Sequence, residues 1–384
     1  MRIFDEKELG YVREVLRSGS LGWNRDGMTG RFEKAFAEFV GSKHAITRNS
    51  AMTALAQAVS CSPAGWDTEV ICDPVVHFAG VAALCENATP VFADIESDTL
   101  LMDPESVKQK ITEKTKALIV TNMWGLCAKL DEIRKICDEH NIFMIEDCAH
   151  NMCSYWKGKH AGTWGHIGVF SFQQSKHLPT GDGGMMVTDD DDLDYKLYNE
   201  WAFGGESPAF FTMNFRMNEV TAAIGLAQLE RVKGYIETYN ACLRHLNSAI
   251  EGCKWLKPRR VDKDAVQSGY IWCCFWQGDK YGMSHDRFKE VAREVGAPLG
   301  FGFVQKPAYN YPVFMSAVDH SSPDRKQYKR HAPYPGKIYT KDDCPIAEDT
   351  IWRIVNSGAM LSNEDDGKRS AEKIRKAIDL MEKG

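Results

Sequence analysis

The chain has 384 residues, 43% hydrophobic and 26% charged, which is typical of a soluble globular protein. Its formal charge of −6 argues against a nucleic-acid binder, because such proteins usually carry a basic face. No apolar run approaches the roughly 20 residues that span a bilayer, and the N-terminal stretch lacks the apolar core of a signal peptide. Twelve cysteines without a C-x-x-C spacing favour a reduced, cytoplasmic protein without a metal site.

The first half of the chain alternates predicted helices with predicted strands. The spacing of Phe32, Phe36 and Phe39 predicts a helix within residues 30–41. A further helix is predicted at residues 51–60, and others follow at 81–88, 103–111 and 129–141. Strands are predicted at residues 68–74, 89–95, 116–122, 142–147, 166–172 and 183–189. This alternation predicts right-handed βαβ units and a mostly parallel sheet that helices cover on both faces.

From residue 218 onward the pattern changes. Residues 218–252 read as one long helix or as two joined end to end. A strand at 270–277 and helices at 285–296 and 366–384 then predict a mixed region. We therefore divide the chain into a large α/β domain, residues 1–250, and a smaller C-terminal α+β domain, residues 251–384, with the long helix as the bridge.

Two charged runs have plain structural interpretations. The acidic run at residues 189–194 is expected to cap the helix that follows it, because carboxylates suit the positive end of the helix dipole. The basic run "KPRR" at residues 257–260 is expected to be a solvated edge rather than a phosphate site.

Several polar residues are predicted to gather at the carboxyl edge of the sheet, where open parallel sheets bind ligands. Asp147 follows an apolar strand, Asn49–Thr53 begins a helix whose free N–H groups favour anions, and Ser171 precedes Lys176 by five positions. Each feature alone is common, but together they fit a ligand with a phosphate, a basic ring nitrogen and a carbonyl. Pyridoxal 5′-phosphate supplies all three, and Lys176 would form a Schiff base with its aldehyde. Phe78 is placed to stack on its ring.

The same segments make the chain recognisable. The stretches "EDCAH", "GTWGHIGVFSFQQSK", "TGDGGMMVTDD" and "NFRMNEVTAAIGLAQLERV" resemble the sugar aminotransferase family named after its DegT, DnrJ, EryC and StrS members. The family lies within fold type I of the pyridoxal-phosphate enzymes. The resemblance runs over nearly the whole chain and implies a mostly parallel seven-stranded sheet with a smaller α+β domain.

The resemblance also implies roles for individual residues. Lys176 matches the Schiff-base lysine, Asp147 the carboxylate on the ring nitrogen, and His150 a position against the ring or its hydroxyl side. Ser171 matches a phosphate-binding serine. Asn214 matches an asparagine that reaches the phosphate of the neighbouring subunit, which implies a homodimer with shared active sites.

The chain departs from the family pattern at several points, among them Gln173 and Gln174, which stand where histidine, proline or tyrosine are common. Met52 and Thr53 match the phosphate-binding loop, but Met52 replaces the usual threonine or serine, so one hydroxyl contact is expected to be missing. His77 replaces a small hydroxyl residue, and it either touches substrate or fills space.

The function implied is transfer of an amino group from L-glutamate or L-glutamine to a keto-sugar, nucleotide-linked or free, or to a ketocyclitol. Such reactions serve amino-sugar, aminocyclitol or antibiotic biosynthesis. We assign substrate contacts to His77, Arg216 and Tyr309, and we expect residues 203–212 and 300–314 to line the acceptor pocket. Arg216 either meets an anionic group or holds the dimer together.

Other functions stay open at this point. Some relatives use the cofactor to dehydrate a sugar and carry histidine in place of the lysine, and here His177 follows Lys176 directly. The five-residue spacing from Ser171 favours Lys176. A lysine-bearing branch that makes aromatic amino acids is a second possibility, and a cofactor-binding regulatory protein without turnover is a third.

Overall fold

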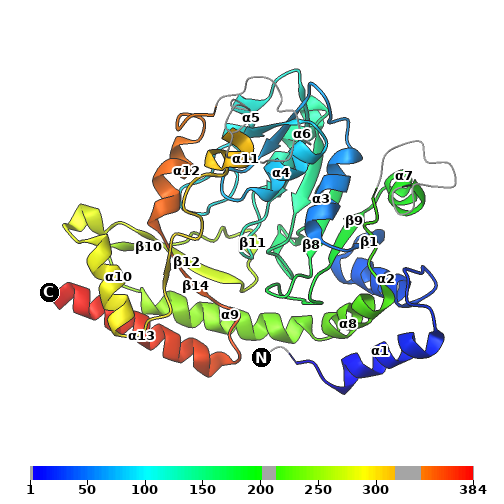
Figure 1. Ribbon diagram of the computed structural model, residues 1–384. Coiled ribbons are helices and arrows are strands. Elements are labelled where there is room, and N and C mark those ends of the chain that lie inside the picture. The colour runs from blue at the N-terminus through cyan, green and yellow to red at the C-terminus, as the bar shows by residue number, and fades with distance from the viewer. Residues whose placement is uncertain (1–2, 201–212, 316–338, 384) are drawn as a thin grey trace, which may run out of the picture.

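A seven-stranded sheet forms the centre of the molecule in the computed structural model, which describes residues 3–200, 213–315 and 339–383 (Figure 1). Only β9 runs against the other strands of this sheet, so the expected mostly parallel seven-stranded sheet is confirmed. The strands, in spatial order, are β1 (His44–Arg48), β9 (Gly184–Thr188), β8 (Ile167–Ser171), β5 (Phe143–Asp147), β4 (Thr115–Thr121), β2 (Glu69–Cys72) and β3 (Thr89–Phe92).

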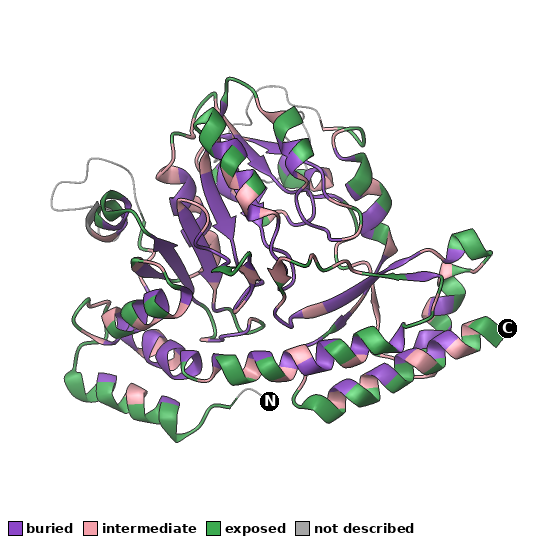
Figure 2. Ribbon diagram, turned by 180° about the vertical axis from the view of Figure 1, so that it is seen from behind, coloured by how far each residue is buried: buried purple, intermediate pink, exposed green. Residues whose placement is uncertain are grey.

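Helices surround this sheet, and Figure 2 shows buried strands between helices whose outer faces are exposed. Phe32 and Phe36 are completely buried on one face of α2, which confirms the helical spacing seen in the sequence. Asp190 caps α7 by accepting hydrogen bonds from two backbone N–H groups, as expected for the acidic run. The helices of this part are α1 (Glu6–Ser18), α2 (Met28–Val40), α3 (Ala51–Ser60), α4 (Phe78–Cys85), α5 (Pro104–Lys110), α6 (Leu130–His140), α7 (Asp191–Tyr195) and a π-helix (Lys196–Glu200).

The predicted long helix is two helices joined end to end, α8 (Glu219–Leu229) and α9 (Val232–Ala249). The early residues of α9, such as Ile236, belong to the main hydrophobic core, whereas Leu243 and Leu246 belong to a second core. The helix therefore links the two cores physically, as Figure 1 shows along the lower side of the molecule.

The second core lies on a four-stranded antiparallel sheet. Its strands, in spatial order, are β10 (Leu256–Pro258), β12 (Ile271–Trp276), β14 (Ile354–Gly358) and β13 (Gly300–Phe301). The later helices of the chain are α10 (His285–Glu294), α11 (Pro312–Met315), α12 (Pro345–Thr350), α13 (Glu364–Lys383) and 3₁₀ turns at Gly278–Tyr281, Ala308–Asn310 and Ile351–Arg353. Of these, α10 and α13 pack on the second core, whereas α11 and α12 pack on the main core. The division of the chain at residue 250 stays a prediction.

A small third sheet ties the later part of the chain to the earlier part. It consists of β11 (Ala265–Val266), β6 (Tyr155–Trp156) and β7 (Lys159–His160). Among the described helices, none combines the length and the apolar character needed to cross a membrane.

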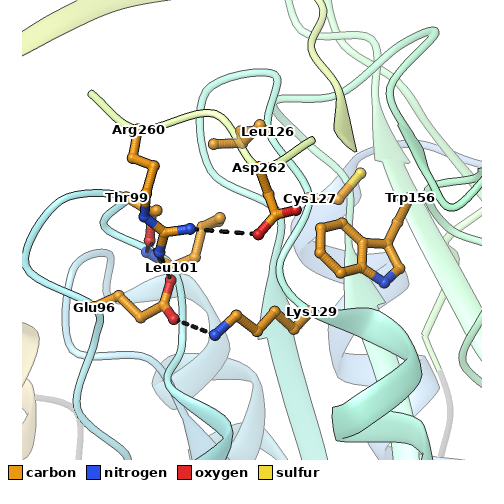
Figure 3. A pocket seen from close by; sticks show the side chains of 9 residues that line it. All are labelled: Glu96, Thr99, Leu101, Leu126, Cys127, Lys129, Trp156, Arg260 and Asp262. Carbon is orange, nitrogen blue, oxygen red and sulfur yellow. Dashed lines mark hydrogen bonds and ion pairs between the residues drawn. The ribbon is translucent and has the colours of Figure 1, made fainter. Parts of the chain in front are cut away.

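The basic run at residues 257–260 contributes to a paired cluster rather than to a solvated edge alone. Figure 3 shows Arg260 and Lys129 on either side of Glu96, each 2.6 Å from it. Arg260 also lies 3.2 Å from Asp98. The cavity between these side chains has a volume of about 10 Å³, room for about one water molecule. The cluster is therefore a seam between loops and not a substrate pocket.

Candidate active site

The carboxyl ends of β4, β5 and β8 meet at one edge of the large sheet. Asp147 ends β5, pairs in register with Thr121 at the end of β4, and is only 2% exposed. The N–H of Ala149 donates to its Oδ1 over 2.9 Å. Parallel pairing therefore places Asp147 at the edge that the sequence predicted.

Burial shapes the chemistry of this carboxyl. It raises the pKa of Asp147 to about 6, with a smaller upward contribution from the Asp73 carboxyl. The Ala149 N–H and the nearby Lys176 ammonium oppose the rise in the Asp147 pKa. A cationic ring nitrogen beside Asp147 would restore its charge, which is what a protonated pyridine requires of a partner.

Lys176 lies in the turn between β8 and β9. The turn extends the hairpin, because the N–H of Phe172 donates to the Gly183 carbonyl and the N–H of Gln174 donates to the Gly181 carbonyl. Lys176 is partly buried, and its Nζ lies 3.2 Å from Tyr270 Oη. The lysine is thus held inside the molecule rather than on an open surface.

His150 completes a compact group with these residues. Its ring lies nearly parallel to that of Tyr270, with centroids 5.0 Å apart and an interplanar angle of 22°. Burial, aided by the Lys176 cation, lowers the pKa of His150 well below its usual value, so the ring is neutral. Its buried Nδ1 has no hydrogen-bond partner within the described residues, and such an orphaned nitrogen fits a polar group on a bound ligand.

The expected phosphate-binding residues also lie together. Ser50 caps α3 by accepting from the Thr53 N–H, so Met52 and Thr53 stand in its first turn. A Cβ on Gly184 would lie 2.6 Å from the Ser50 carbonyl carbon, and Gly184 pairs across the hairpin with Ser171. Only glycine permits this approach, which brings the start of α3 beside Ser171 and makes a cradle for an anion.

Asn214 and Arg216 lie against the same helix start. The Asn49 side chain donates to the Asn214 carbonyl over 3.2 Å, and the Asn49 N–H donates to the Phe215 carbonyl over 2.8 Å. Asn214 is exposed, and its Oδ1 accepts from the Arg216 N–H. The backbone at Asn214 is therefore fixed close to the cradle within its own chain.

An aromatic group stands at the start of α4. The rings of His77 and Phe78 are 4.3 Å apart, and the Tyr311 ring lies 5.7 Å from that of His77. Phe78 is 41% exposed, and partial burial lowers the pKa of His77. Tyr311 thus lies beside His77, on the side of the site where we expect the acceptor.

Tyr309 lies elsewhere than expected for a substrate contact. It is completely buried, its ring packs 5.5 Å from that of Phe92, and its hydroxyl donates to Glu348 over 2.8 Å. The structure therefore places Tyr309 in the hydrophobic core, and not beside Tyr311 in the lining of the expected acceptor pocket. The other predicted pocket segment, residues 203–212, lies outside the described residues.

The structure adds two residues that the sequence analysis missed. Tyr270, a residue of the main core that directly precedes β12, touches Lys176 and His150. Asp73 follows β2 as Asp147 ends β5, and it accepts hydrogen bonds from Thr121 and from two backbone N–H groups. A carboxylate after an apolar strand was therefore an available signal for Asp73, whereas no local pattern marks Tyr270.

Comparison with known proteins agrees with this geometry. A sequence profile of the DegT/DnrJ/EryC1/StrS aminotransferase family matches residues 2–332. GDP-perosamine synthase of Escherichia coli O157:H7 is 30% identical, over 93% of this chain and 92% of the relative. The spore coat polysaccharide biosynthesis protein SpsC of Bacillus subtilis is 33% identical, over 89% of this chain and 92% of the relative.

A solved structure matches along the whole chain. The aminotransferase from Psychrobacter cryohalolentis superposes with a TM-score of 0.83 at 25% identity, covering 99% of this chain and 98% of its own. The buried Asp147, the orphaned His150 nitrogen and the glycine-lined cradle fit pyridoxal phosphate. The chain belongs to the DegT/DnrJ/EryC1/StrS aminotransferase family and is a pyridoxal-phosphate-dependent aminotransferase.

Proposed function

We propose that this enzyme moves an amino group from L-glutamate or L-glutamine to the carbonyl of a keto-sugar or ketocyclitol, in amino-sugar, aminocyclitol or antibiotic biosynthesis. The observation that carries the proposal is the convergence of Lys176, Asp147 and His150 at one sheet edge. Two relatives similar over nearly their full length are named for a GDP-linked product and for polysaccharide biosynthesis. Their names support a sugar acceptor, with a nucleotide-linked one as the first choice.

The chain's own residues divide the work. When bound, pyridoxal phosphate supplies an aldehyde and a ring that accepts electrons. We assign the ring nitrogen to Asp147, the ring face to Phe78 and the ring or its hydroxyl side to His150. Lys176 Nζ would hold the aldehyde at rest and, when displaced by the donor's amine, would be placed to take the proton from the donor α-carbon.

The anionic end of the cofactor is assigned to the cradle. Ser171 offers a hydroxyl, and the first turn of α3 offers the Met52 backbone N–H and the Thr53 side chain, while the Thr53 N–H caps the helix through Ser50. The backbone N–H of Met52 can serve although its side chain has no hydroxyl. His77 and Arg216 are assigned to the substrate side.

The contacts of His177 bear on the dehydratase alternative. His177 is 1% exposed, and its Nε2 lies 2.9 Å from the Gly269 carbonyl oxygen. Lys176 acts electrostatically on both Asp147 and His150, whereas His177 acts on His150 and not on Asp147. These contacts support Lys176 as the reactive residue and a structural role for His177.

Borohydride reduction of the cofactor-loaded protein tests the assignment of Lys176. We expect the reduced cofactor on the peptide that contains Lys176, and no such adduct with Lys176→Ala. The same preparation, mixed with glutamate, should convert its cofactor to the amine form and then aminate an acceptor from a panel of keto-sugar nucleotides, free keto-sugars and ketocyclitols. Label on another lysine would refute the site, and absence of the half-reaction would favour a regulatory protein.

We also infer a homodimer with shared sites, in which Asn214 serves the neighbouring subunit. Mixing Lys176→Ala with Asn214→Ala protein should then restore about a quarter of the wild-type activity, because half of the random dimers carry one intact site. No restoration after subunit exchange would contradict sharing. All twelve cysteines are free, which supports a cytoplasmic location. Protein isolated under alkylating conditions should carry an alkyl group on every cysteine by mass spectrometry, and disulfide-linked cysteines would contradict that location.

A further inference from the structure

The segment of residues 268–270, which we call the strap, brings part of the second half of the chain into the active site. Ser268 Oγ lies 2.8 Å from Ser154 Oγ, and the Ser268 N–H donates to the Gly125 carbonyl over 2.9 Å. A Cβ on Gly269 would lie 2.5 Å from the Tyr239 carbonyl carbon. The strap is therefore docked tightly, with no room for a larger residue at its centre.

Tyr270 ends the strap, and its ring packs near the rings of two histidines. The centroid of the His150 ring is 5.0 Å from that of Tyr270, and the centroid of the His177 ring is 5.1 Å away. Tyr270 is 6% exposed. Packing on these rings fixes the direction of the phenol, which brings its oxygen to 3.2 Å from Lys176 Nζ.

Backbone contacts hold the strap and the lysine turn together. The Ala359 N–H donates to the Tyr270 carbonyl over 2.9 Å, which anchors the strap near the end of β14. The ring of His177, the residue after Lys176, contacts the carbonyl of Gly269, the residue before Tyr270. The strap is thus held to β14 at Tyr270 and to the lysine turn at Gly269, next to the contact between Tyr270 and the amine.

We propose that Tyr270 is a positioning residue for Lys176. Its hydroxyl oxygen accepts a hydrogen bond from the amine whenever the amine is not joined to the cofactor, and so holds Nζ on the side of Asp147 and His150. Lysine has a flexible four-carbon stem, and a freed amine without such a partner would sample many rotamers. The inference rests on the proposed role of Lys176 as the base.

Labelling of the cofactor-free protein tests the contact without any amino transfer. Wild-type protein and Tyr270→Phe are treated with a limiting acylating reagent across a range of pH, and the modified fraction of Lys176 is read by peptide mass spectrometry. The oxygen holds the amine in one hydrogen-bonded position, so its removal should free the amine and displace the whole labelling profile toward faster reaction. At neutral pH we expect labelling of Lys176 to be about tenfold faster.

The variants separate the hydroxyl from the ring. Tyr270→Phe retains the ring packing, whereas Tyr270→Leu removes the ring as well, and Tyr239→Phe removes a hydroxyl from another ring near His177. A displaced profile in Tyr270→Phe, with a wild-type profile in Tyr239→Phe, supports the inference. A displacement in Tyr270→Leu alone would mean that the ring only fills space, and it would overturn the inference.

Turnover gives a second readout. Tyr270→Phe should lower kcat about tenfold and leave the KM for the amino donor nearly unchanged, because the amine is misplaced while donor binding persists. An unchanged kcat would overturn the inference even if the labelling profile moved. If wild-type enzyme forms no borohydride adduct at Lys176, the proposed function fails instead, and the labelling result then reports only a hydrogen bond.

Discussion

Glu146 and Asp147 are neighbours at the end of β5, both carboxyls are buried, and their surroundings differ sharply. Successive strand residues point to opposite faces of a sheet. On one face Glu146 meets a full set of donors from the protein. These are the backbone N–H groups of Gly162 at 2.8 Å, Trp164 at 2.7 Å and Gly165 at 2.9 Å, and the side-chain amide of Asn122 at 3.1 Å.

Asp147 faces a region that the protein has not closed in this way. The Ala149 N–H is its backbone donor, burial raises its pKa to about 6, and His150 nearby holds an unpartnered nitrogen. The comparison teaches how to separate structural from ligand-binding carboxylates of equal burial. A network closed by the chain itself is structural, and polar atoms left over at a sheet edge indicate a bound group.

The largest expected effect is a loss of amino transfer on substitution of Asp147, which lies on the face of β5 that the chain's own donors do not close. We call this the open face, and the face of Glu146 the closed face. Asp147→Asn keeps the shape of the side chain but cannot hold the charge that a protonated ring nitrogen needs, so amino transfer should fall about 1000-fold. Stability of the cofactor-free protein should change little at pH 4 and below, because there the buried carboxyl is neutral in the folded state, as the amide is. Single-turnover conversion of the cofactor by glutamate measures the first effect and urea unfolding the second. A fall of less than tenfold would break the comparison.

Substitution of Glu146, on the closed face, should lower the stability of the protein rather than its ability to bind the cofactor. Glu146→Ala leaves the N–H groups of three loop residues without acceptors, which should cost about 4 kcal/mol of unfolding free energy. The folded fraction should still bind cofactor. Glu146→Gln keeps one acceptor oxygen and serves as the matched variant, with about half the loss. Urea titrations measure the unfolding free energies of both variants. A Glu146→Ala protein of wild-type stability would show that the hydrogen-bond network around Glu146 is dispensable.

Local sequence features indicate the residues of the open face better than those of the closed face, and the reason is physical. Lys176, Ser171 and Asp147 are marked by local features: a strand end, a fixed spacing and a glycine-rich turn. The donors of Glu146 lie on a loop whose path depends on tertiary packing. Tyr270 reaches Lys176 from 94 residues away, which no local pattern could reveal.

The same limit explains what the fold prediction left out. The helices and the longer strands follow from local periodicity, and most were placed within a few residues. Strand β1 was not predicted, although it forms the edge of the main sheet, because its pairing with β9 joins distant parts of the chain. The short strands β10, β13 and β14 depend on similarly remote partners.

The pH dependence of the unfolding free energy gives a further test of the surroundings of Asp147. In the cofactor-free protein the folded state releases the Asp147 proton near its pKa of about 6, whereas an unfolded chain releases it near the ordinary pKa of 3.8. Between these values the folded state binds more protons, so this group lowers stability as pH rises, by about 3 kcal/mol over the full window.

The difference between wild type and Asp147→Asn isolates that contribution from other titrating groups. Wild type should lose stability relative to the variant between pH 4 and pH 6, as measured by urea midpoints at each pH. Saturation with cofactor should remove the difference, because a cation then pairs with the carboxylate. Parallel curves for the two cofactor-free proteins would contradict the raised pKa.

The smallest effect is expected at the charged seam around Arg260, which the sequence alone presents as a basic run. Its charges are already paired within the protein, and Arg260 retains 37% side-chain exposure (Figure 3). Arg260→Gln should therefore cost at most about 1 kcal/mol, less at high salt, and Lys257→Gln, a more exposed matched variant, should cost less again. Cofactor affinity should not change in either variant, because the seam offers no unpaired charge to a phosphate. If Arg260→Gln weakened cofactor binding, paired networks and ligand faces could no longer be told apart by counting the donors and acceptors that the chain supplies.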